Sequence, residues 1–247
     1  MNKNIFKGKN TALFDLDGTI VETKPIVLKA LRQILEENEL SFVNEEDYFI
    51  TGGIDWKDIW EAVKIADAPS LEKSTTDLGD ETHKRYIELL KEADLVVKEG
   101  LWDLLYELRE EKKFKIGLTT NSEKDIAEVV MEKLSLDDVF DFAIFGDSVK
   151  KKKPNPEMYK KSLKGLKSRP SETIVFEDSL IGSEAAAKIK LDLIIVWNGE
   201  IPKYRFPGTT KLYIYDFTEL VGTLDETKYE YILRRVKEVG GIPQNPS

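Results

Sequence analysis

The sequence predicts an α/β protein: a doubly wound parallel sheet with an inserted all-helical domain. Two observations carry this prediction. Short apolar runs of strand length alternate with stretches in which apolar residues recur every three or four positions, as is typical of β–α–β units. The interval from about residue 23 to residue 97 departs from this alternation, because it shows helical patterns alone.

Each expected strand is a nearly continuous apolar run, the pattern of a strand that helices cover on both faces. The six runs are residues 11–14, 115–119, 142–145, 173–176, 193–197 and 212–215. Helices are expected at residues 123–134, 157–166, 180–189 and 223–240, where the apolar spacing is helical.

The inserted segment contains three further helical patterns, at residues 26–35, 56–65 and 82–90. It follows the first strand directly and so leaves the carboxyl edge of the sheet, where open α/β sheets bind ligands. We therefore expect two domains. Residues 1–22 and 98–247 form a Rossmann-like catalytic core, and residues 23–97 form a helical cap over its site.

Composition limits the function. The chain of 247 residues has 37 basic and 46 acidic side chains, a net charge of −9 that argues against a nucleic-acid partner. Without cysteine and with a single histidine, it has no disulfide, thiolate or Cys/His zinc site, so any metal is expected on oxygen ligands. No apolar run approaches the roughly 20 residues of a membrane span. We expect a cytoplasmic protein without a membrane partner, either a monomer or a homodimer.

The first strand ends in the segment Asp15-Leu16-Asp17-Gly18-Thr19. Positions two apart in extended chain project to one side, so both carboxylates can face one point beyond the strand tip. Such a pair can divide nucleophilic and acid/base work or hold a hard cation. A calcium loop is excluded, because Thr19, Ile20 and Ile26 occupy positions where it needs an acid or Asn, Gly and Glu. Two ordinary surface acids are the alternative, which the buried strand before them makes less favoured.

Two later segments, residues 120–122 and 150–153, also contain polar or charged side chains that could contribute to a site. After the second strand come Thr120, Asn121 and Ser122; we expect Thr120 to bind a phosphate and Ser122, with Asp125, to cap the next helix. In the run from Lys150 to Lys153, the adjacent Pro154 fixes only Lys153, which we expect to be a buried cation. Lys150, Lys151 and Lys152 are expected to lie in solvent.

The fourth expected strand leads into Glu177, Asp178 and Ser179, with Gly182 following. Acids at a strand tip again suggest a cation. Asp178 or Ser179 could instead simply cap the helix, but capping alone leaves the pair of acids unexplained.

In this order the four sites resemble the four motifs of the haloacid dehalogenase superfamily, over about residues 10–200. The inserted segment lies where members with a helical C1 cap carry that cap. Within the superfamily, the chain looks most similar to the phosphoglycolate phosphatase and β-phosphoglucomutase group.

The resemblance implies roles for the motif residues. Asp15 would be the nucleophile that forms an aspartyl-phosphate, and Asp17 the general acid and base. Mg²⁺ would be held by Asp15, the backbone carbonyl of Asp17 and Asp178, with Glu177 outside its ligands. Thr120, the amide of Asn121 and Lys153 would hold the phosphate.

The implied activity is a Mg²⁺-dependent phosphatase for a small phosphorylated metabolite: a sugar phosphate, phosphoglycolate or a nucleotide monophosphate. Asp17 favours phosphate esters, because dehalogenases and phosphonatases of the superfamily lack it. The alternatives are a phosphomutase and a non-catalytic phosphate-binding protein. Similar mutases carry a histidine near Val27 and an arginine in the loop at residues 52–56, and this sequence has neither.

The cap gives weaker signals. The loop at residues 51–55 either reaches into the site or is a plain turn between helices. Trp56 and Trp60 share a helix face and are expected in the cap core, and His83 is expected to be an ordinary surface or interface histidine. Hinges for cap movement are expected near Thr23 and Val97.

Overall fold

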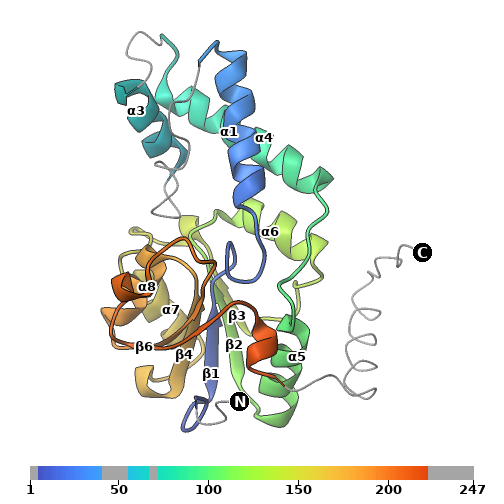
Figure 1. Cartoon of the computed structure of the whole chain (residues 1–247), viewed down its shortest axis with the longest axis vertical. Coiled ribbons are helices and arrows are strands. Elements are labelled where there is room, and N and C mark those ends of the chain that lie inside the picture. The colour runs from blue at the N-terminus through green and yellow to red at the C-terminus, as the bar shows by residue number, and fades with distance from the viewer. Residues whose placement is uncertain (1–4, 41–54, 67–71, 222–247) are drawn as a thin grey trace, which may run out of the picture.

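A computed structural model describes residues 5–40, 55–66 and 72–221. Its centre is a six-stranded parallel sheet in the order β3-β2-β1-β4-β5-β6 (Figure 1). The strands are β1 (Thr11–Phe14), β2 (Lys115–Thr119), β3 (Phe142–Ile144), β4 (Thr173–Glu177), β5 (Asp192–Val196) and β6 (Thr210–Ile214). All six expected strands are present, with bounds that differ by two residues or fewer, so the predicted fold class is confirmed.

Helices cover both faces of this sheet. They are α5 (Leu101–Tyr106), α6 (Lys124–Lys133), α7 (Glu157–Gly165) and α8 (Leu180–Ala187); α5 continues as a π-helical turn (Glu107–Glu111). Because successive residues of a strand face opposite sides, Ala12 and Phe14 of β1 pack in the apolar cluster of α5 and α6, whereas Leu13 packs with α7 and α8. Helix α5 is not among the helices expected from the sequence.

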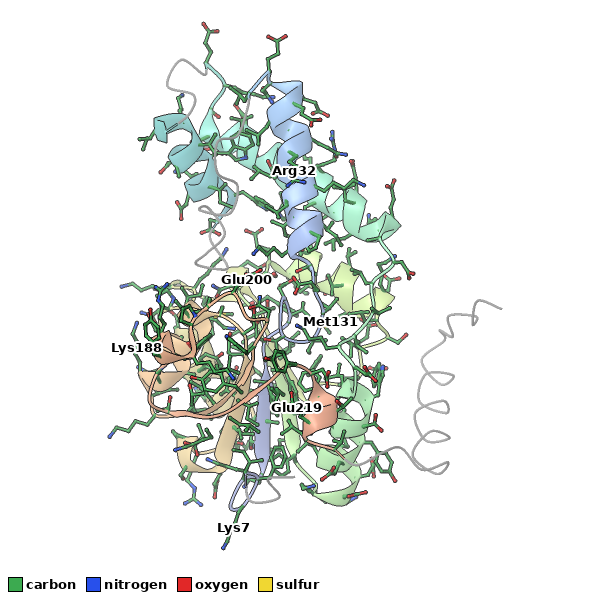
Figure 2. The ribbon with its side chains drawn as sticks, viewed as in Figure 1. Lys7, Arg32, Met131, Lys188, Glu200 and Glu219 are labelled. Atoms are coloured by element: carbon green, nitrogen blue, oxygen red, sulfur yellow. The ribbon has the colours of Figure 1, made fainter. Side chains whose placement is uncertain are left out.

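Short 3-10 turns connect several of these elements. They lie at Gly146–Ser148, Pro170–Glu172, Lys203–Arg205 and Phe217–Glu219. Exposed lysines such as Lys7 and Lys188 project outward from the sheet and its helices (Figure 2). None of the helices in the described ranges combines the length and apolarity needed to cross a membrane.

Beyond the carboxyl edge of the sheet stand three helices: α1 (Lys24–Glu37), α3 (Trp56–Ala66) and α4 (Thr75–Glu92) (Figure 1). They enclose an apolar cluster of their own, formed by Leu31, Ile34, Leu35, Ile59, Trp60, Val63 and Leu78. Trp60 is fully buried there, and its indole N–H donates to Thr82 Oγ1 at 2.8 Å. Trp60 therefore lies where it was predicted, whereas Trp56 packs at the edge of this cluster and also reaches the large cavity described below.

Helix α4 begins seven residues earlier than predicted. Its first two turns are largely polar and so lack the apolar spacing used for prediction. Ser74 caps this end by accepting a hydrogen bond from the backbone N–H of Asp77 at 3.0 Å. The predicted helix at residues 223–240 and residues 51–54 of the predicted cap loop lie outside the described residues, and the domain boundaries at 22/23 and 97/98 stay predictions.

Candidate active site

The central strand β1 brings the first predicted motif to the carboxyl edge of the sheet. Phe14 is paired with Leu118 of β2 and with Phe176 of β4, so the residues that follow all three strands meet at this edge. The backbone N–H of Asp15 still bonds Phe176 O at 3.0 Å. Asp15 is thereby fixed beside Glu177, and its side chain is almost fully buried.

Gly18 allows Asp178 to approach the tip of β1. Its φ of +80° lies in the region that glycine adopts without strain. A Cβ atom at this position would lie 2.1 Å from Asp178 Oδ2, which is much closer than atoms can pack. Thr19 then donates from Oγ1 to Asp178 Oδ1 at 3.1 Å. A glycine at residue 18 is thus required both by the turn and by the carboxylate against it.

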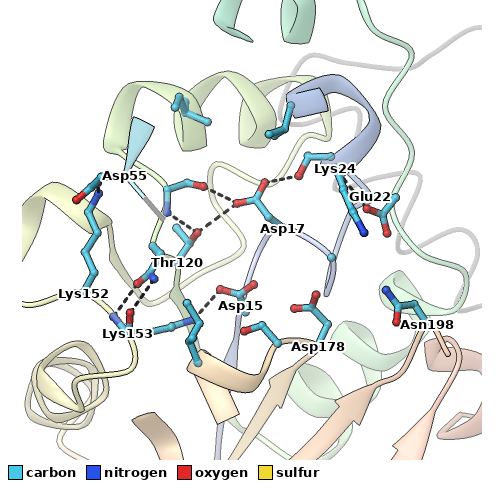
Figure 3. A pocket seen from close by; sticks show the side chains of 18 of the residues that line it. Asp15, Asp17, Glu22, Lys24, Asp55, Thr120, Lys152, Lys153, Asp178 and Asn198 are labelled. Carbon is cyan, nitrogen blue, oxygen red and sulfur yellow. Dashed lines mark hydrogen bonds and ion pairs between the residues drawn. The ribbon is translucent and has the colours of Figure 1, made fainter. Parts of the chain in front are cut away.

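Lys153 is the buried cation that the sequence predicts. Its ammonium group donates at 2.6 Å to Asp15 Oδ1 (Figure 3), to Glu177 Oε1 and to the carbonyl of Thr119, which uses all three of its hydrogens. Burial lowers the pKa of Lys153, but the charges of Asp15 and Glu177 outweigh that effect and hold the pKa above its ordinary value. The side chain is therefore positively charged at any physiological pH.

Negative charge at this edge exceeds the positive charge of Lys153. Burial raises the pKa of Asp15 well above its usual range, against the lowering effect of Lys153. Burial and the neighbouring Glu177 raise the pKa of Asp178 to about 8. Oxygen atoms of Asp15, Glu177 and Asp178 lie within 4.8 Å of one another. A cluster of hard oxygen donors with uncompensated charge fits Mg²⁺, which prefers carboxylates and water.

Glu177 is saturated by hydrogen bonds. Its Oε1 accepts from Lys153 and from Tyr159 Oη at 2.7 Å, and its Oε2 accepts from Ser179 Oγ at 3.0 Å. Gly182 leaves room for this carboxylate, since a Cβ there would lie 1.9 Å from Oε1. Asp178 is therefore the better placed of the two acids to meet a cation. Tyr159 was not foreseen, because in the sequence it is one more apolar position of a helix.

Asp17 is held by hydroxyl groups. Thr23 Oγ1 donates to Oδ1 at 2.7 Å, and Ser122 Oγ and Thr120 Oγ1 donate to Oδ2 at 2.5 and 3.4 Å (Figure 3). The prediction that Ser122 caps the next helix is wrong. Helix α6 starts at Lys124, so its N-cap residue is Glu123, whose side chain makes no capping hydrogen bond. The Ser122 hydroxyl donates to Asp17 instead.

Thr120 and Asn121 lie beside this cluster. Thr120 is buried, and its Oγ1 also accepts from the backbone N–H of Ser122 at 3.0 Å. The Asn121 side chain exchanges hydrogen bonds with the backbone of Lys153, accepting at 2.9 Å and donating at 3.3 Å. Asn121 thus ties the end of β2 to the segment that carries the buried cation.

Asp15, Asp17, Lys153 and Asp178 form a group that we call the strand-tip cluster. This cluster lines a cavity of about 610 Å³ between the sheet edge and the three helices beyond it. Both groups line it, with Asp15, Thr120 and Lys153 on the sheet side and Trp56 and Tyr86 on the helix side. The helices therefore enclose the space next to the carboxylates, which suits a small ligand.

Lys152 also lines the cavity, so the prediction that it lies in solvent is wrong. Its side chain is 22% exposed and forms ion pairs with Asp55, at the start of α3, and with Glu123 at 3.7 Å. A run of four lysines does not indicate which of them turns inward. Only the fold, which brings Asp55 above this segment, shows it.

His83 joins α4 to the start of α6, as an interface histidine. Its Nε2 lies 2.7 Å from Asp125 Oδ2, and its Nδ1 lies 3.8 Å from Glu123 Oε2. These three residues form a second group that could hold a metal, but the two ring nitrogens face different carboxylates, which is the arrangement of an ion pair.

Comparisons with known proteins agree with this geometry. The model of a family described as haloacid dehalogenase-like hydrolase matches residues 12–196. A "phosphorylated carbohydrates phosphatase" of Thermotoga maritima is 32% identical over 74% of this chain and 82% of its own length. The pyrophosphatase PpaX of Bacillus mycoides is 28% identical over 72% of this chain and 80% of its own.

Solved structures share the fold. The crystal structure of CbbY from Rhodobacter sphaeroides in complex with phosphate has a TM-score of 0.74 at 24% identity, covering 86% of this chain and 96% of that one. The β-phosphoglucomutase of Clostridium difficile has a TM-score of 0.70 at 24% identity, covering 93% and 98%. At these identities the likeness concerns the fold alone.

Proposed function

Because the chain belongs to the haloacid dehalogenase-like hydrolase family, we propose that it is a Mg²⁺-dependent phosphatase that acts on a small phosphorylated metabolite through an aspartyl-phosphate. The family and the class of enzyme, a phosphatase, agree with what the sequence predicts. The observation that carries the proposal further is the position of the Lys153 ammonium group. It lies 2.6 Å from Oδ1 of Asp15, the residue that follows β1, and both residues line the same cavity as Asp178.

In this proposal Asp15 is the nucleophile. One of its carboxylate oxygens attacks phosphorus, the bond from phosphorus to the leaving oxygen breaks, and the phosphoryl group becomes attached to Asp15. Lys153 binds Asp15 Oδ1 and so orients the carboxylate while reducing its repulsion of the phosphate. Thr120, whose hydroxyl lies at the same edge, and the amide of Asn121 would hold phosphate oxygens.

Asp17 would serve as the general acid and then the general base. It gives a proton to the leaving oxygen, and it later takes one from the water that attacks the aspartyl-phosphate. The hydroxyls of Thr23 and Ser122 suit both states, because a hydroxyl can donate to a carboxylate or accept from a protonated acid. Asp17 can therefore change its protonation state without losing its position.

The residues that would hold Mg²⁺ are Asp15, Asp178 and the backbone carbonyl of Asp17, with Glu177 kept out by its own hydrogen bonds. When bound, the ion supplies Lewis-acid stabilisation of the charge on the phosphoryl group. Asp178 is oriented for this by the Thr19 hydroxyl.

The test uses p-nitrophenyl phosphate with the purified protein, with Mg²⁺ and after chelation by EDTA. Phosphate release should require Mg²⁺ and should be lost in Asp15→Asn, while the control Asp138→Asn, which changes an exposed acid, keeps it. Activity that survives in Asp15→Asn or in EDTA would contradict the proposal. A hexose 1-phosphate followed by phosphorus NMR separates hydrolysis from mutase activity, since a mutase forms the 6-phosphate without releasing an equal amount of free phosphate.

A further inference from the structure

The charged side chains of the cavity wall away from the strand tips bear on whether the substrate can carry a second phosphate group. Outside the strand-tip cluster it carries four acidic and three basic side chains, the latter being Lys24, Lys152 and Arg205. A second phosphate on the substrate would need one of these cations to be free. The partners of the two lysines therefore decide what kind of leaving group fits.

Lys152 is held at both ends. Its stem is packed tightly, because a Cβ on Gly146 would lie 2.9 Å from its Cε. Its ammonium group pairs with Asp55 and, at 3.7 Å, with Glu123. Two carboxylates thus neutralise a cation that is only 22% exposed, and a third anion near it would have to displace one of them or face repulsion from both.

Lys24, at the start of α1, pairs with one carboxylate instead of two, and its side chain is 35% exposed. Its ammonium group lies 2.9 Å from Glu200, which lies where the helices beyond the sheet meet the core (Figure 2). Arg205 has no ion pair among the residues that the structure describes, but it is exposed, so solvent and salt screen its charge. Within the part of the chain that the structure describes, both lysines of this wall are thus paired, Lys152 with two carboxylates and Lys24 with one at a more exposed position.

Part of the remaining wall is apolar and aromatic. Trp56 and Tyr86 meet edge to face with ring centroids 5.8 Å apart, and Val27 and Ile59 lie beside them. Aromatic and aliphatic surfaces can pack against the C–H groups of a sugar or polyol, while the paired charges remain available to its hydroxyls. Both features favour a leaving group that is polar but uncharged.

We infer that the preferred substrate is a monophosphate of an uncharged sugar or polyol, and that Asp55 and Glu200 set this preference by neutralising Lys152 and Lys24. This inference rests on the proposed phosphatase function and narrows it. A bisphosphate or pyrophosphate brings a second anion to a wall whose two lysines are already paired with carboxylates, and such like-charge contacts are costly.

The test compares kcat/KM for glucose 6-phosphate, glucose 1,6-bisphosphate and pyrophosphate, with p-nitrophenyl phosphate as the reference reaction. The wild-type protein should favour the monophosphate by about tenfold or more. Asp55→Asn and Glu200→Gln should each shrink that ratio several-fold by freeing a lysine. Glu61→Gln, an exposed acid of α3 that pairs only with Lys57 among the described residues, should leave the ratio unchanged.

A double variant sharpens the test. Asp55→Asn together with Lys152→Gln removes both charges of the pair, so the substrate ratio should return towards the wild-type value. The inference is overturned if the wild-type protein prefers the bisphosphate or pyrophosphate, or if Asp55→Asn leaves the ratio unchanged while p-nitrophenyl phosphate is still hydrolysed. If the wild-type protein hydrolyses none of these substrates, the proposed function itself is overturned, and the inference with it.

Discussion

Replacing Lys153 by methionine should damage the fold and the activity together, because this lysine is the only cation that touches the carboxylates at the described strand tips. The methionine keeps most of the stem volume but leaves Asp15 and Glu177 without the ammonium group, now 2.6 Å from each. Removing one partner from a buried ion pair typically costs about 3–5 kcal/mol, and losing an electrostatic contact to the reacting group about 10²-fold or more in rate.

The loss of stability should depend on pH. Without Lys153, the pKa of Asp15 should rise further, since the lysine is what lowers it now. A carboxyl whose folded pKa lies above its unfolded pKa destabilises the fold increasingly as pH rises between the two values. The variant should therefore lose more stability at pH 7.5 than at pH 5.5, where protonation relieves the unpaired charge.

Urea unfolding of metal-free protein at both pH values measures this effect, and phosphate release measures the activity. Lys151→Met is the matched control, because the Lys151 side chain is exposed and should change neither quantity. A deficit for Lys153→Met below about 1 kcal/mol, or one equal at the two pH values, would refute the assigned charge balance.

Three further predictions follow from the same cluster. In EDTA, the wild-type protein should lose thermal stability as pH rises from 3.8 to about 8, because folding raises the pKa of Asp178 over that range. Mg²⁺ should remove most of this pH dependence, and a flat profile in EDTA would count against a raised pKa of Asp178. Gly182→Ala should cost about 1–3 kcal/mol in urea unfolding, since its Cβ would collide with Glu177, whereas Gly208→Ala, with nothing within 4 Å, should be close to neutral; equal effects would contradict this packing. Tyr159→Phe should cost about 1–2 kcal/mol by removing a hydrogen bond from a buried carboxylate, and an unchanged urea midpoint would argue against that bond.

The sequence located the strand tips because buried strands leave a strong local signal. The run before Asp15 and the run before Glu177 are both apolar and short, and parallel pairing of β1 with β4 then places the two acids side by side. Lys153 was likewise identified by its neighbouring proline. What these predictions share is that the informative residues lie next to the one that is predicted.

Other parts of the site depend on contacts that local sequence does not encode. The Ser122 hydroxyl donates to Asp17, which is 105 residues away, and does not cap the helix end beside it. Lys152 turns inward only because Asp55, which is 97 residues away, stands above it, and His83 finds its partners on α6 in the same way. Such pairings follow from how the three outer helices sit on the sheet, which apolar periodicity alone does not specify.

The apolar cluster inside α1, α3 and α4 limits how freely the cavity wall can change, because α1 and α4 also pack in the cluster of the sheet. Trp60 and its neighbours hold these helices together, but Val27 and Tyr86, which face the cavity, pack in the apolar cluster of the sheet, and Ile59, which also faces it, belongs to the cluster of the helices. Exchanging a cavity-facing residue of these helices therefore alters the packing of one cluster or the other together with the cavity wall. A new shape of the cavity wall would thus need compensating changes in the residues packed behind it.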